Sequence, residues 1–315
     1  MSISRKFLLP FSPLYGLATR LRNKLYDHGI FKSQSYQLPL ICVGNLSVGG
    51  TGKSPMVEYL IQLLEKDRKL ATLSRGYGRK TKGFHLLAET DLAEMVGDEP
   101  LQFKTKFPTM NVAVDEDRQR GISELIKKTD PEVIILDDAF QHRRVKAGLN
   151  ILLTSYGNLY VNDQLLPAGD LREPITGAKR AEIIVVTKCP PHLAIEEQEK
   201  IKRELNIESY QHLFFGYIDY STQIMNDVGA IPLQHIKDKQ VVLVTGIAND
   251  KPLVDHLRNQ DIVFDYQKFP DHYNYKIKDL DKLGDIILTT EKDYMRLKSL
   301  ILSQELYYIP IQSNY

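Results

Sequence analysis

The sequence is notable first for what it lacks. It contains no tryptophan and only two cysteines, Cys42 and Cys189, among 315 residues. The cysteines do not form a Cys-x-x-Cys pair, which excludes a zinc ribbon and a disulfide-stabilised scaffold. No apolar run reaches about 18 residues, so we expect no helix to cross a bilayer. The net charge is only +1; a general nucleic-acid binder would be markedly basic, so we expect no nucleic-acid partner.

The length and the mixture of residues are those of a folded protein. Apolar residues make up 43% and charged residues 26% of the chain, which is ordinary for globular proteins. A chain of this size buries a large core without disulfides or metals. At about 150 residues per domain, the length indicates about two domains.

Basic charge is concentrated at the start of the chain. Residues 1–38 contain six Lys or Arg and one Asp, a net charge of +5, so the remaining residues sum to −4. The first nine residues are similar to the start of a signal peptide. However, Pro10 and Pro13 break the apolar stretch and basic residues follow at once, so we do not expect a signal peptide.

An amphipathic helix is predicted inside this basic segment, with Ser12 as its N-cap and Pro13 in its first turn. Five apolar side chains then follow helical spacing: Leu14, Leu17, Ala18, Leu21 and Leu25. Cations flank this stripe, as they do in a helix that lies in a membrane interface. The pattern alone also fits an ordinary helix whose apolar face packs on the domain, which is the more frequent case.

Strands and helices alternate in the rest of the first two thirds of the chain. Apolar runs predict strands at residues 40–43, 70–73, 111–114, 133–136, 151–154 and 183–187. Helices are expected at residues 55–66 and 118–128. Repeated alternation of this kind predicts an α/β fold with a mostly parallel sheet flanked by helices.

A second, smaller α/β unit is predicted toward the C-terminus. Strands are expected at residues 213–218, 241–245, 262–266 and 286–289, and helices at residues 251–259 and 276–283. The boundary is expected near residues 215–235, where no core pattern is visible. We therefore divide the chain into an N-terminal helical region (1–38), a core domain (39–220) and a small domain (221–315).

The strongest motif is a glycine-rich loop between the first strand and the first helix of the core domain. Its residues are Ser47, Val48, Gly49, Gly50, Thr51, Gly52, Lys53 and Ser54. Such a loop wraps backbone N–H groups around phosphate oxygens, and the following helix adds its positive dipole. Lys53 would reach the β- and γ-phosphates and Ser54 would ligate Mg²⁺. The first position of the motif is usually glycine and here is Ser47.

Two carboxylates support this prediction. Asp137 and Asp138 follow the apolar strand at residues 133–136, where phosphate-loop enzymes place an aspartate that holds Mg²⁺. Adjacent side chains on a strand point to opposite faces, so both reach one metal only if the strand ends at Asp137. By itself, an aspartate turn after a buried strand would be equally reasonable.

Several further stretches are unusual but ambiguous. Residues 74–80 form a basic, glycine-rich loop at the sheet edge where ligands bind in parallel α/β folds, although a surface turn would look alike. Asp98 opens a helix and could simply cap it. Residues 139–144 and 165–174 add a polar turn and a Pro/Gly-framed loop, and His272 is a lone histidine. The sequence has no protein-kinase H-R-D or D-F-G motif.

Taken together, these stretches resemble the tetraacyldisaccharide 4'-kinase (lipid A 4'-kinase) family over nearly the whole chain. Seven stretches carry the resemblance in order: residues 44–55, 74–78, 97–100, 137–142, 171–174, 269–272 and 290–293. The resemblance implies transfer of the γ-phosphate of ATP to the 4'-hydroxyl of tetraacyldisaccharide 1-phosphate, giving lipid IVA in lipid A biosynthesis. It also implies an enzyme bound peripherally or monotopically at the cytoplasmic face of the inner membrane. Its active site would lie in a cleft between the two domains, which the smaller domain closes.

The resemblance assigns roles to particular residues. Asp98 would be the base that accepts the hydroxyl proton, paired with His272. The carboxylates near Mg²⁺ would be Asp137, Asp138 and Glu173. The positions expected to contact the lipid or its phosphate are Arg75, Tyr77, Arg118, Gln141 and Arg172. Because the lipid stays in the membrane, the basic apolar stripe of residues 14–25 is then interpreted as an interfacial anchor.

Two positions depart from the family pattern. Ala139 stands where the family often has glycine, which could crowd the backbone near the metal. Asp170 stands where it often has proline, which adds a charge beside Arg172. Neither residue belongs to the phosphate loop or is the proposed base.

Two other functions remain to be weighed. A GTPase or ATPase acting as a switch in chaperoning or maturation would use Thr290-Glu291-Lys292-Asp293 as its base-reading motif, but the Asn of N-K-x-D is missing and Lys and Asp are adjacent. A soluble small-molecule kinase would have no need of the +5 apolar segment. A binding-only module is disfavoured by a phosphate loop followed by metal carboxylates.

Overall fold

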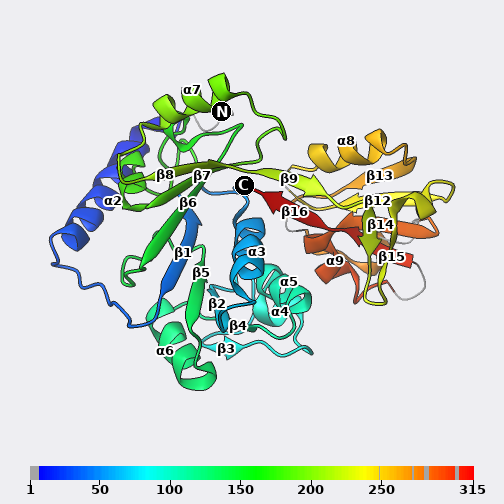
Figure 1. Cartoon of the computed structure of the whole chain (residues 1–315), viewed down its shortest axis with the longest axis horizontal. Coiled ribbons are helices and arrows are strands. Elements are labelled where there is room, and N and C mark those ends of the chain that lie inside the picture. The colour runs from blue at the N-terminus through cyan, green and yellow to red at the C-terminus, as the bar shows by residue number, and fades with distance from the viewer. Residues whose placement is uncertain (1–6, 248, 272, 280–283, 302–304) are drawn as a thin grey trace.

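The computed structural model describes residues 7–247, 249–271, 273–279, 284–301 and 305–315. Two β-sheets organise these residues into two α/β units that lie side by side along the long axis of the molecule (Figure 1). The larger sheet belongs to the first two thirds of the chain and the smaller one to the last third.

The larger sheet has eight strands in the order β3-β4-β2-β5-β1-β6-β7-β8. Every neighbouring pair is parallel except β3 and β4. The strands are β1 (Leu40–Asn45), β2 (Leu70–Ser74), β3 (His85–Leu86), β4 (Asn111–Val114), β5 (Val133–Asp137), β6 (Leu149–Ser155), β7 (Ile183–Thr187) and β8 (His212–Phe215). The central strands are buried on both faces, because helices cover each side.

Helices α3 (Lys53–Leu64) and α5 (Asp98–Lys106) pack on one face of this sheet. Helices α6 (Arg118–Thr129) and α7 (Ile195–Leu205) pack on the other. The short helix α4 (Ala93–Val96) directly precedes α5. The parallel sheet flanked by helices that the sequence predicts is therefore confirmed.

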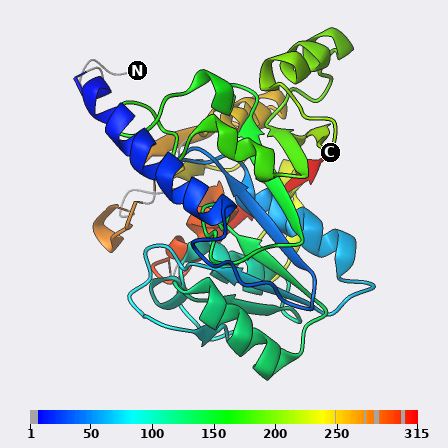
Figure 2. The same ribbon diagram turned by 90° about the vertical axis from the view of Figure 1, so that its left-hand side faces the viewer.

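Helix α2 (Ser12–Asp27) runs along the outside of this unit (Figure 2). Its small and polar residues Ser12, Gly16 and Thr19 are buried against the unit. Its leucines face outward: Leu14 is 67% exposed and Leu17 is 65% exposed. The hypothesis that the apolar face of this helix packs on the domain is therefore wrong. None of the described helices is both long enough and apolar enough to cross a membrane.

The predicted N-cap of α2 is also corrected. Phe11 occupies the N-cap position without a side-chain cap, and Ser12 is the first helical residue. The hydroxyl of Ser12 donates instead to the carbonyl oxygen of Leu165 at 2.9 Å. A residue that would otherwise stabilise its own helix therefore joins α2 to the loop at residues 165–174.

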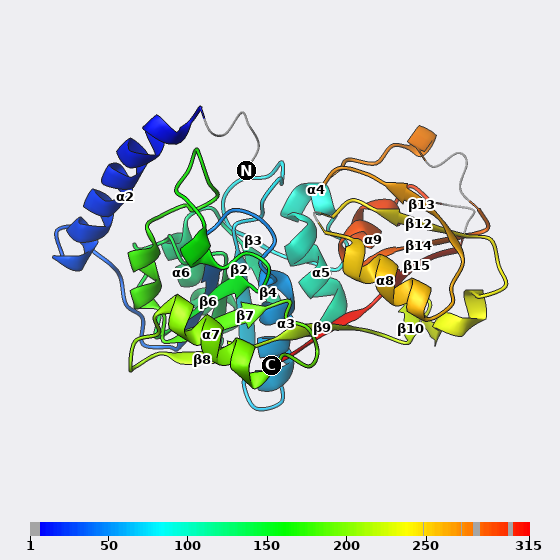
Figure 3. The ribbon, with the colours of Figure 1, turned by 90° about the horizontal axis from the view of Figure 1, so that it is seen from above.

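The smaller sheet has six strands in the order β11-β10-β15-β14-β12-β13. They are β10 (Gln223–Met225), β11 (Ala230–Pro232), β12 (Val241–Thr245), β13 (Phe264–Lys268), β14 (Ile286–Thr290) and β15 (Glu305–Ile309). Helix α8 (Lys251–Asn259) packs on one face. Helix α9 (Glu291–Leu297) lies on the other face and points toward the larger unit, where it faces α5 (Figure 3).

A short two-stranded ribbon connects the units. It pairs β9 (Tyr217–Tyr220) with β16 (Ile311–Asn314), the last strand of the chain. The C-terminal Tyr315 then packs edge-on against Tyr59 of α3, with ring centroids 4.7 Å apart. The chain end predicted to belong to the small domain thus returns to the larger unit.

The predicted element boundaries hold well in the core and less well in the smaller unit. The strand expected at 213–218 is two strands, β8 and β9, separated by Gly216. The strand expected at 262–266 is shifted to Phe264–Lys268. Of the helix expected at 276–283, the described part is only a 3-10 turn at Ile277–Asp279, and residues 280–283 lie outside the described residues.

Candidate active site

The phosphate loop lies at the carboxyl edge of the larger sheet, between β1 and α3. Gly52 is the N-cap of α3 with a left-handed φ of 84°, and no side chain caps the helix. The first N–H groups of α3 therefore point out of the helix without a side-chain acceptor, as an anion site requires. Lys53 and Ser54 are the first two residues of this helix. The loop thus lies between a strand and a helix, as the sequence predicts.

The phosphate loop is fastened to the loop at residues 165–174. The backbone N–H of Val48 donates to Asp170 O at 2.8 Å, and that of Arg172 donates to Leu46 O at 2.7 Å. Ser47 forms an antiparallel bridge with Leu171. Asp170, where the family often has proline, therefore contributes a backbone carbonyl at this point. The two loops are therefore joined through their backbones, and Arg172 lies beside the phosphate-binding residues.

Strand β5 ends at Asp137, which is the condition for both aspartates to reach one site. Asp138 has a left-handed φ of 46°, and this turn breaks the alternation of the strand. Asp137 is buried, and one of its oxygens accepts from the Ser74 hydroxyl at 3.2 Å. Its other oxygen, Oδ1, is buried without a hydrogen-bond partner among the described residues. The two carboxylates therefore present different environments at the same strand end.

Asp138 is held by two cations. The Arg172 guanidinium donates to Oδ1 at 2.8 Å and to Oδ2 at 3.2 Å, and Lys53 Nζ lies 3.7 Å from Oδ1. Burial acts to raise the pKa of Asp138, but the hydrogen bonds from Arg172 and the charge of Lys53 outweigh it, so the pKa is lowered. Asp138 is thus kept ionised next to the phosphate loop.

Asp137 has the opposite electrostatic character. Burial, followed by repulsion from Glu99 and Asp138, raises its pKa to about 7. Together with the orphaned Oδ1, this marks a carboxylate that would gain from a divalent cation. The described residues contain no group of three His, Cys, Asp or Glu side chains arranged around a metal. The Ser54 hydroxyl, the two aspartates and nucleotide phosphates nevertheless form the ligand set of a phosphate-loop site.

Glu173 occupies a different environment from the one expected of a metal ligand. It is fully buried. Its Oε1 accepts from Arg180 at 2.8 Å and Gln141 at 3.0 Å, and its Oε2 accepts from Asn23 at 2.8 Å. Both oxygens are therefore engaged by protein donors. The geometry makes Glu173 an anchor that ties four segments of the chain together beneath Arg172.

Gln141 and Arg118 both lie behind the strand ends. Gln141 donates to Asn45 O at 2.8 Å as well as to Glu173. Arg118 is buried, donates to Asp137 O at 3.0 Å, and has its Nε unpartnered among the described residues. It lines a cavity of about 720 Å³ on the α6 side of the sheet, together with His142 and Arg143. This cavity is a place where a ligand could reach Arg118.

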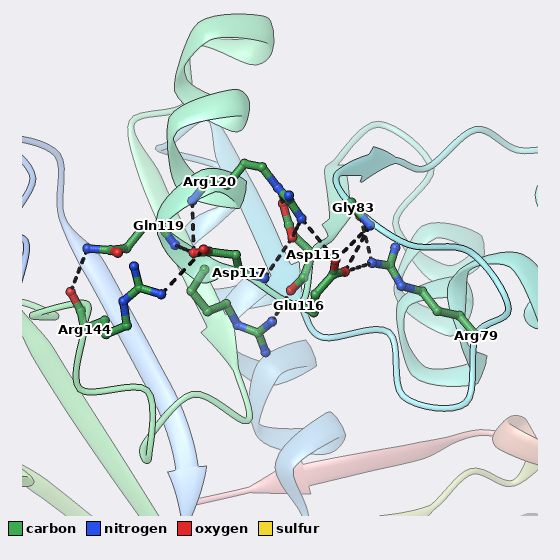
Figure 4. Close-up of polar contacts among 9 residues, drawn as sticks. Arg79, Gly83, Asp115, Glu116, Asp117, Gln119, Arg120 and Arg144 are labelled. Atoms are coloured by element: carbon green, nitrogen blue, oxygen red, sulfur yellow. Dashed lines mark hydrogen bonds and ion pairs between the residues drawn. The ribbon is translucent and has the colours of Figure 1, made fainter. Parts of the chain in front are cut away.

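The basic, glycine-rich loop after β2 carries Arg75 and Tyr77 on the surface, and Tyr77 is 76% exposed. The loop is held from behind (Figure 4): Arg79 donates to Glu116 at 2.6 Å and to Gly83 O at 2.7 Å. The N–H of Gly83 donates back to Glu116 at 3.0 Å. Hydrogen bonds from its own backbone and from Gly83, then Arg79, lower the pKa of Glu116 to about 2.

Asp98 is the first residue of α5 and does not cap it, because Gly97 occupies the N-cap position. A Cβ at Gly97 would lie 3.1 Å from Tyr77 O, so only glycine permits this approach to the Tyr77 loop. The carboxylate of Asp98 is bound by Arg296 of α9, whose Nε donates to Oδ2 at 2.9 Å. His272, the predicted partner of Asp98, lies outside the described residues.

Three residues at the site were not predicted as functional. Asn45 is buried and donates to the Thr51 hydroxyl at 2.7 Å, and its Oδ1 accepts from Arg172. Lys188 donates to Gly50 O, and burial and the charge of Lys53 lower its pKa. Arg296 reaches the site from the other unit. Lys188 follows an apolar run in the sequence, as Asp137 does, and this pattern could have identified it as a candidate site residue. No local sequence pattern identifies Arg296 as one.

Comparisons with known proteins agree with this geometry. The family model described as "Tetraacyldisaccharide-1-P 4'-kinase" matches residues 4–315. A tetraacyldisaccharide 4'-kinase from Flavobacterium johnsoniae is 50% identical, over 100% of this chain and 94% of the relative. One from Bacteroides thetaiotaomicron is 42% identical, over 98% of this chain and 88% of the relative.

A solved structure is similar over nearly the whole chain as well. The crystal structure of LpxK from Aquifex aeolicus in complex with ATP has 34% sequence identity and a TM-score of 0.81. The similarity covers 99% of this chain and 95% of that one. Because both units are included, it confirms the α/β fold class.

Proposed function

The chain belongs to the tetraacyldisaccharide-1-P 4'-kinase family, and from that premise we propose how its own residues carry out the reaction. The enzyme is a tetraacyldisaccharide 4'-kinase of lipid A biosynthesis. It transfers the γ-phosphate of ATP to the 4'-hydroxyl of tetraacyldisaccharide 1-phosphate and forms lipid IVA. Phosphoryl transfer needs positioning and charge neutralisation more than covalent help, so the roles below concern where charges and protons are held.

The ATP phosphates bind at the N-terminus of α3. Backbone N–H groups of residues 47–54 surround the phosphates, and the helix dipole adds positive potential. Lys53 lies within reach of Asp138, and in the complex its ammonium group neutralises the β- and γ-phosphates. Arg172 brings a second cation to the same carboxylate. The phosphates are thus met by two cations that the protein has already oriented.

Ser54, Asp137 and Asp138 would hold Mg²⁺. The donor set fits the ion, because it consists of hard oxygen ligands and includes a buried carboxylate oxygen on Asp137 that has no hydrogen-bond partner among the described residues. When bound, Mg²⁺ neutralises charge that develops on the transferred phosphate. In place of the metal role first expected of Glu173, we propose that it positions Arg172 and Gln141, because both of its oxygens accept hydrogen bonds from protein donors.

Asp98 accepts the proton of the 4'-hydroxyl, and His272 orients or relays that proton. Asp98 is only partly exposed and lies at the start of α5, where the backbone approaches Tyr77. Arg75, Tyr77, Gln141 and Arg172 contact the lipid or its phosphate, and Arg118 acts through the cavity that it lines. The base is thereby supported next to the loop that carries lipid-binding side chains.

The lipid substrate is reached at the membrane surface. The exposed leucines of α2, its cations and the +5 charge of residues 1–38 suit a helix in the interface. We place the enzyme at the cytoplasmic face of the inner membrane as a peripheral or monotopic protein. The same helix contacts the Arg172 loop, so membrane binding brings the site to the lipid headgroup.

The observation that carries the proposed roles is the meeting of Lys53, Asp138 and Arg172 at the phosphate loop. The test incubates the protein with labelled ATP, Mg²⁺ and the lipid disaccharide in detergent micelles. We expect a lipid product that has gained one phosphate, and none with EDTA in excess. ATP hydrolysis without a phosphorylated lipid would instead favour a nucleotide-driven switch.

A further inference from the structure

The segment Thr290-Glu291-Lys292-Asp293 has no role in the reaction as described so far. It opens α9 in the smaller unit, with the Thr290 hydroxyl accepting from the N–H of Asp293 at 3.1 Å as an N-cap. Helix α9 faces α5, the helix that begins with Asp98 (Figure 3). The segment therefore belongs to the contact between the two units.

Four residues on one side of α9 each contact a residue of α5. Glu291 accepts from Gln102 at 2.8 Å, and Lys292 Nζ lies 3.6 Å from Glu99. The Thr105 hydroxyl donates to Met295 Sδ at 3.8 Å. Arg296 completes the series by binding Asp98. Positions 291, 292, 295 and 296 lie on one helical face, so this face of α9 fixes both ends of α5.

The Arg296 guanidinium is itself held from behind. Its Nε and Nη2 both donate to Oδ2 of Asp98, the first at 2.9 Å, and its Nη1 lies 3.5 Å from Asp293. Asp293 is fully buried and accepts from the N–H of Gly246 at 2.9 Å and from the hydroxyl of Tyr275 at 3.1 Å. The guanidinium is thus anchored to the end of β12 and to the segment that follows Phe269.

Other charged groups continue the contact between α5 and α9. Besides Arg296, the neighbouring pair on α5 and α9 is Glu99 with Lys292, and the group formed by Glu58, Lys106 and Glu291 lies two turns further along α5. Burial acts to lower the pKa of Arg296, but the hydrogen bond and charge of Asp98, followed by the charge of Asp293, raise it overall.

We propose that Arg296 is the positioning residue of the catalytic base: the smaller unit supplies the guanidinium that orients Asp98. This inference rests on the proposed role of Asp98. Two charge-assisted hydrogen bonds to Oδ2 hold that oxygen of Asp98 in place, and a misplaced base loses much of its effect. The Thr290–Asp293 segment builds the platform for this contact, which gives the motif a function other than reading a nucleotide base.

The experiment compares the wild type with Arg296→Gln, Arg296→Lys and Lys298→Gln, assayed with ATP, Mg²⁺ and lipid in micelles. Lys298 is the matched control, because it is a cation at the C-cap of the same helix that pairs with Asp227 rather than with α5. For Arg296→Gln we expect kcat to fall about 10- to 100-fold, with KM for ATP unchanged within about twofold because the phosphate loop is intact.

The pH profile separates positioning from a structural effect. A cation beside a carboxylate lowers its pKa, so Arg296→Gln should move the acid limb of kcat/KM upward by about one pH unit. Arg296→Lys keeps the charge and should leave this limb in place, with a smaller loss of kcat. Lys298→Gln should behave as wild type. Thermal melting with ATP checks that each variant is folded.

Three results would overturn the inference: wild-type kcat in Arg296→Gln, an acid limb that does not move in it, or an equal shift in Arg296→Lys. Asp98→Asn serves as the reference for the underlying assignment. If Asp98→Asn is active, the base itself is misassigned and the proposed function fails at that point. If Asp98→Asn is inactive while Arg296→Gln is unaffected, only the inference about Arg296 fails.

Discussion

The side-chain amide of Asn23 donates a 2.8 Å hydrogen bond to the buried carboxylate of Glu173, which lies 150 residues away in the chain. The Tyr15 hydroxyl donates to the carbonyl oxygen of the adjacent Arg172 at 2.7 Å. Helix α2 therefore docks on the active-site loop through polar groups. The exposed residues Leu14, Leu17 and Leu21 are not used for docking, and this separation makes the membrane role testable without disturbing the site.

We predict that Leu14→Gln, Leu17→Gln and Leu21→Gln combined weaken binding to anionic vesicles strongly, by tenfold or more. Each leucine is more than half exposed, and each buried leucine side chain contributes roughly 1.5–3 kcal/mol on leaving water. The melting temperature should change little, because exposed side chains contribute little to folding. Vesicle co-sedimentation measures the binding.

The matched control replaces three exposed apolar residues elsewhere, Leu63, Ile195 and Val263, by Gln. Equal sedimentation of the α2 variant and this control would show that α2 is not the membrane contact. Deletion of residues 1–25 is a poorer test, because it also removes Tyr15 and Asn23 from the Arg172 loop.

The phosphate loop gives a second prediction, that Lys53→Ala reduces kcat by at least about 100-fold while the protein stays folded. Loss of a preorganised charge at the developing negative charge typically costs this much. Lys53 Nζ lies 3.7 Å from Asp138 Oδ1, which is long for an ion pair. The pair therefore contributes little to the free energy of unfolding. Steady-state kinetics measure the effect, and circular dichroism verifies the fold. A near-normal kcat would refute the role of the loop.

A third prediction concerns the loop that carries Arg75 and Tyr77. Arg79→Ala removes the contact with Glu116 and Gly83 that supports this loop from behind. We expect KM for the lipid to rise about three- to tenfold, because a loosened loop must be ordered on binding. KM for ATP should stay constant, since the phosphate loop is not involved.

The control for this loop is Arg68→Ala, which removes only an exposed ion pair with Glu132. Arg68 lies just before β2, at the opposite end of that strand from the loop. Lipid titrations at saturating ATP distinguish the two variants. If Arg79→Ala leaves the KM for lipid unchanged or raises both KM values equally, the loop does not contact the lipid selectively.

The sequence predicted the parts of the site that are built from local segments. The phosphate loop and the Asp137-Asp138 strand end each lie in one short stretch, where hydrophobic periodicity and glycine placement determine the backbone. The end of the strand at Asp137 was stated only as a condition, and the left-handed turn at Asp138 was not predicted. The central strands of the larger sheet were predicted well, because they are buried on both faces and are continuously apolar. Its short edge strand β3 was not predicted, and the residues of its other edge strand, β8, were assigned to the smaller unit.

Contacts between segments that are far apart in the chain could not be predicted from the sequence. Glu173 resembles a metal ligand by its place beside Arg172, and only the fold brings Arg180, Gln141 and Asn23 to its two oxygens. Arg296 reaches Asp98 from a separate unit, 198 residues away. The ribbon that includes the last strand pairs short, half-exposed segments, which carry no strong periodic pattern.

A last prediction comes from a buried charge cluster that spans both units. Lys106 Nζ lies 2.6 Å from Glu58 and 3.2 Å from Glu291, and the Gln102 amide donates to both carboxylates at 2.8 Å. Two buried carboxylates thus share one lysine. Burial, followed by repulsion from Glu291, raises the pKa of Glu58 to about 7 from its ordinary value of 4.5, although Lys106 opposes the shift.

This shift makes stability fall as pH rises. Between pH 4.5 and about 7 the folded protein keeps a proton on Glu58 that the unfolded chain releases, so deprotonation favours unfolding. A shift of this size corresponds to a loss of up to about 3 kcal/mol across that window. We therefore expect Glu58→Gln, which stays neutral, to flatten the decline in the free energy of unfolding between pH 5 and pH 8. Urea denaturation at several pH values measures the slope, and Glu65→Gln, an exposed carboxylate just after α3, should retain the wild-type slope. Identical slopes for wild type and Glu58→Gln would mean that Glu58 is ionised throughout, with Lys106 neutralising both carboxylates.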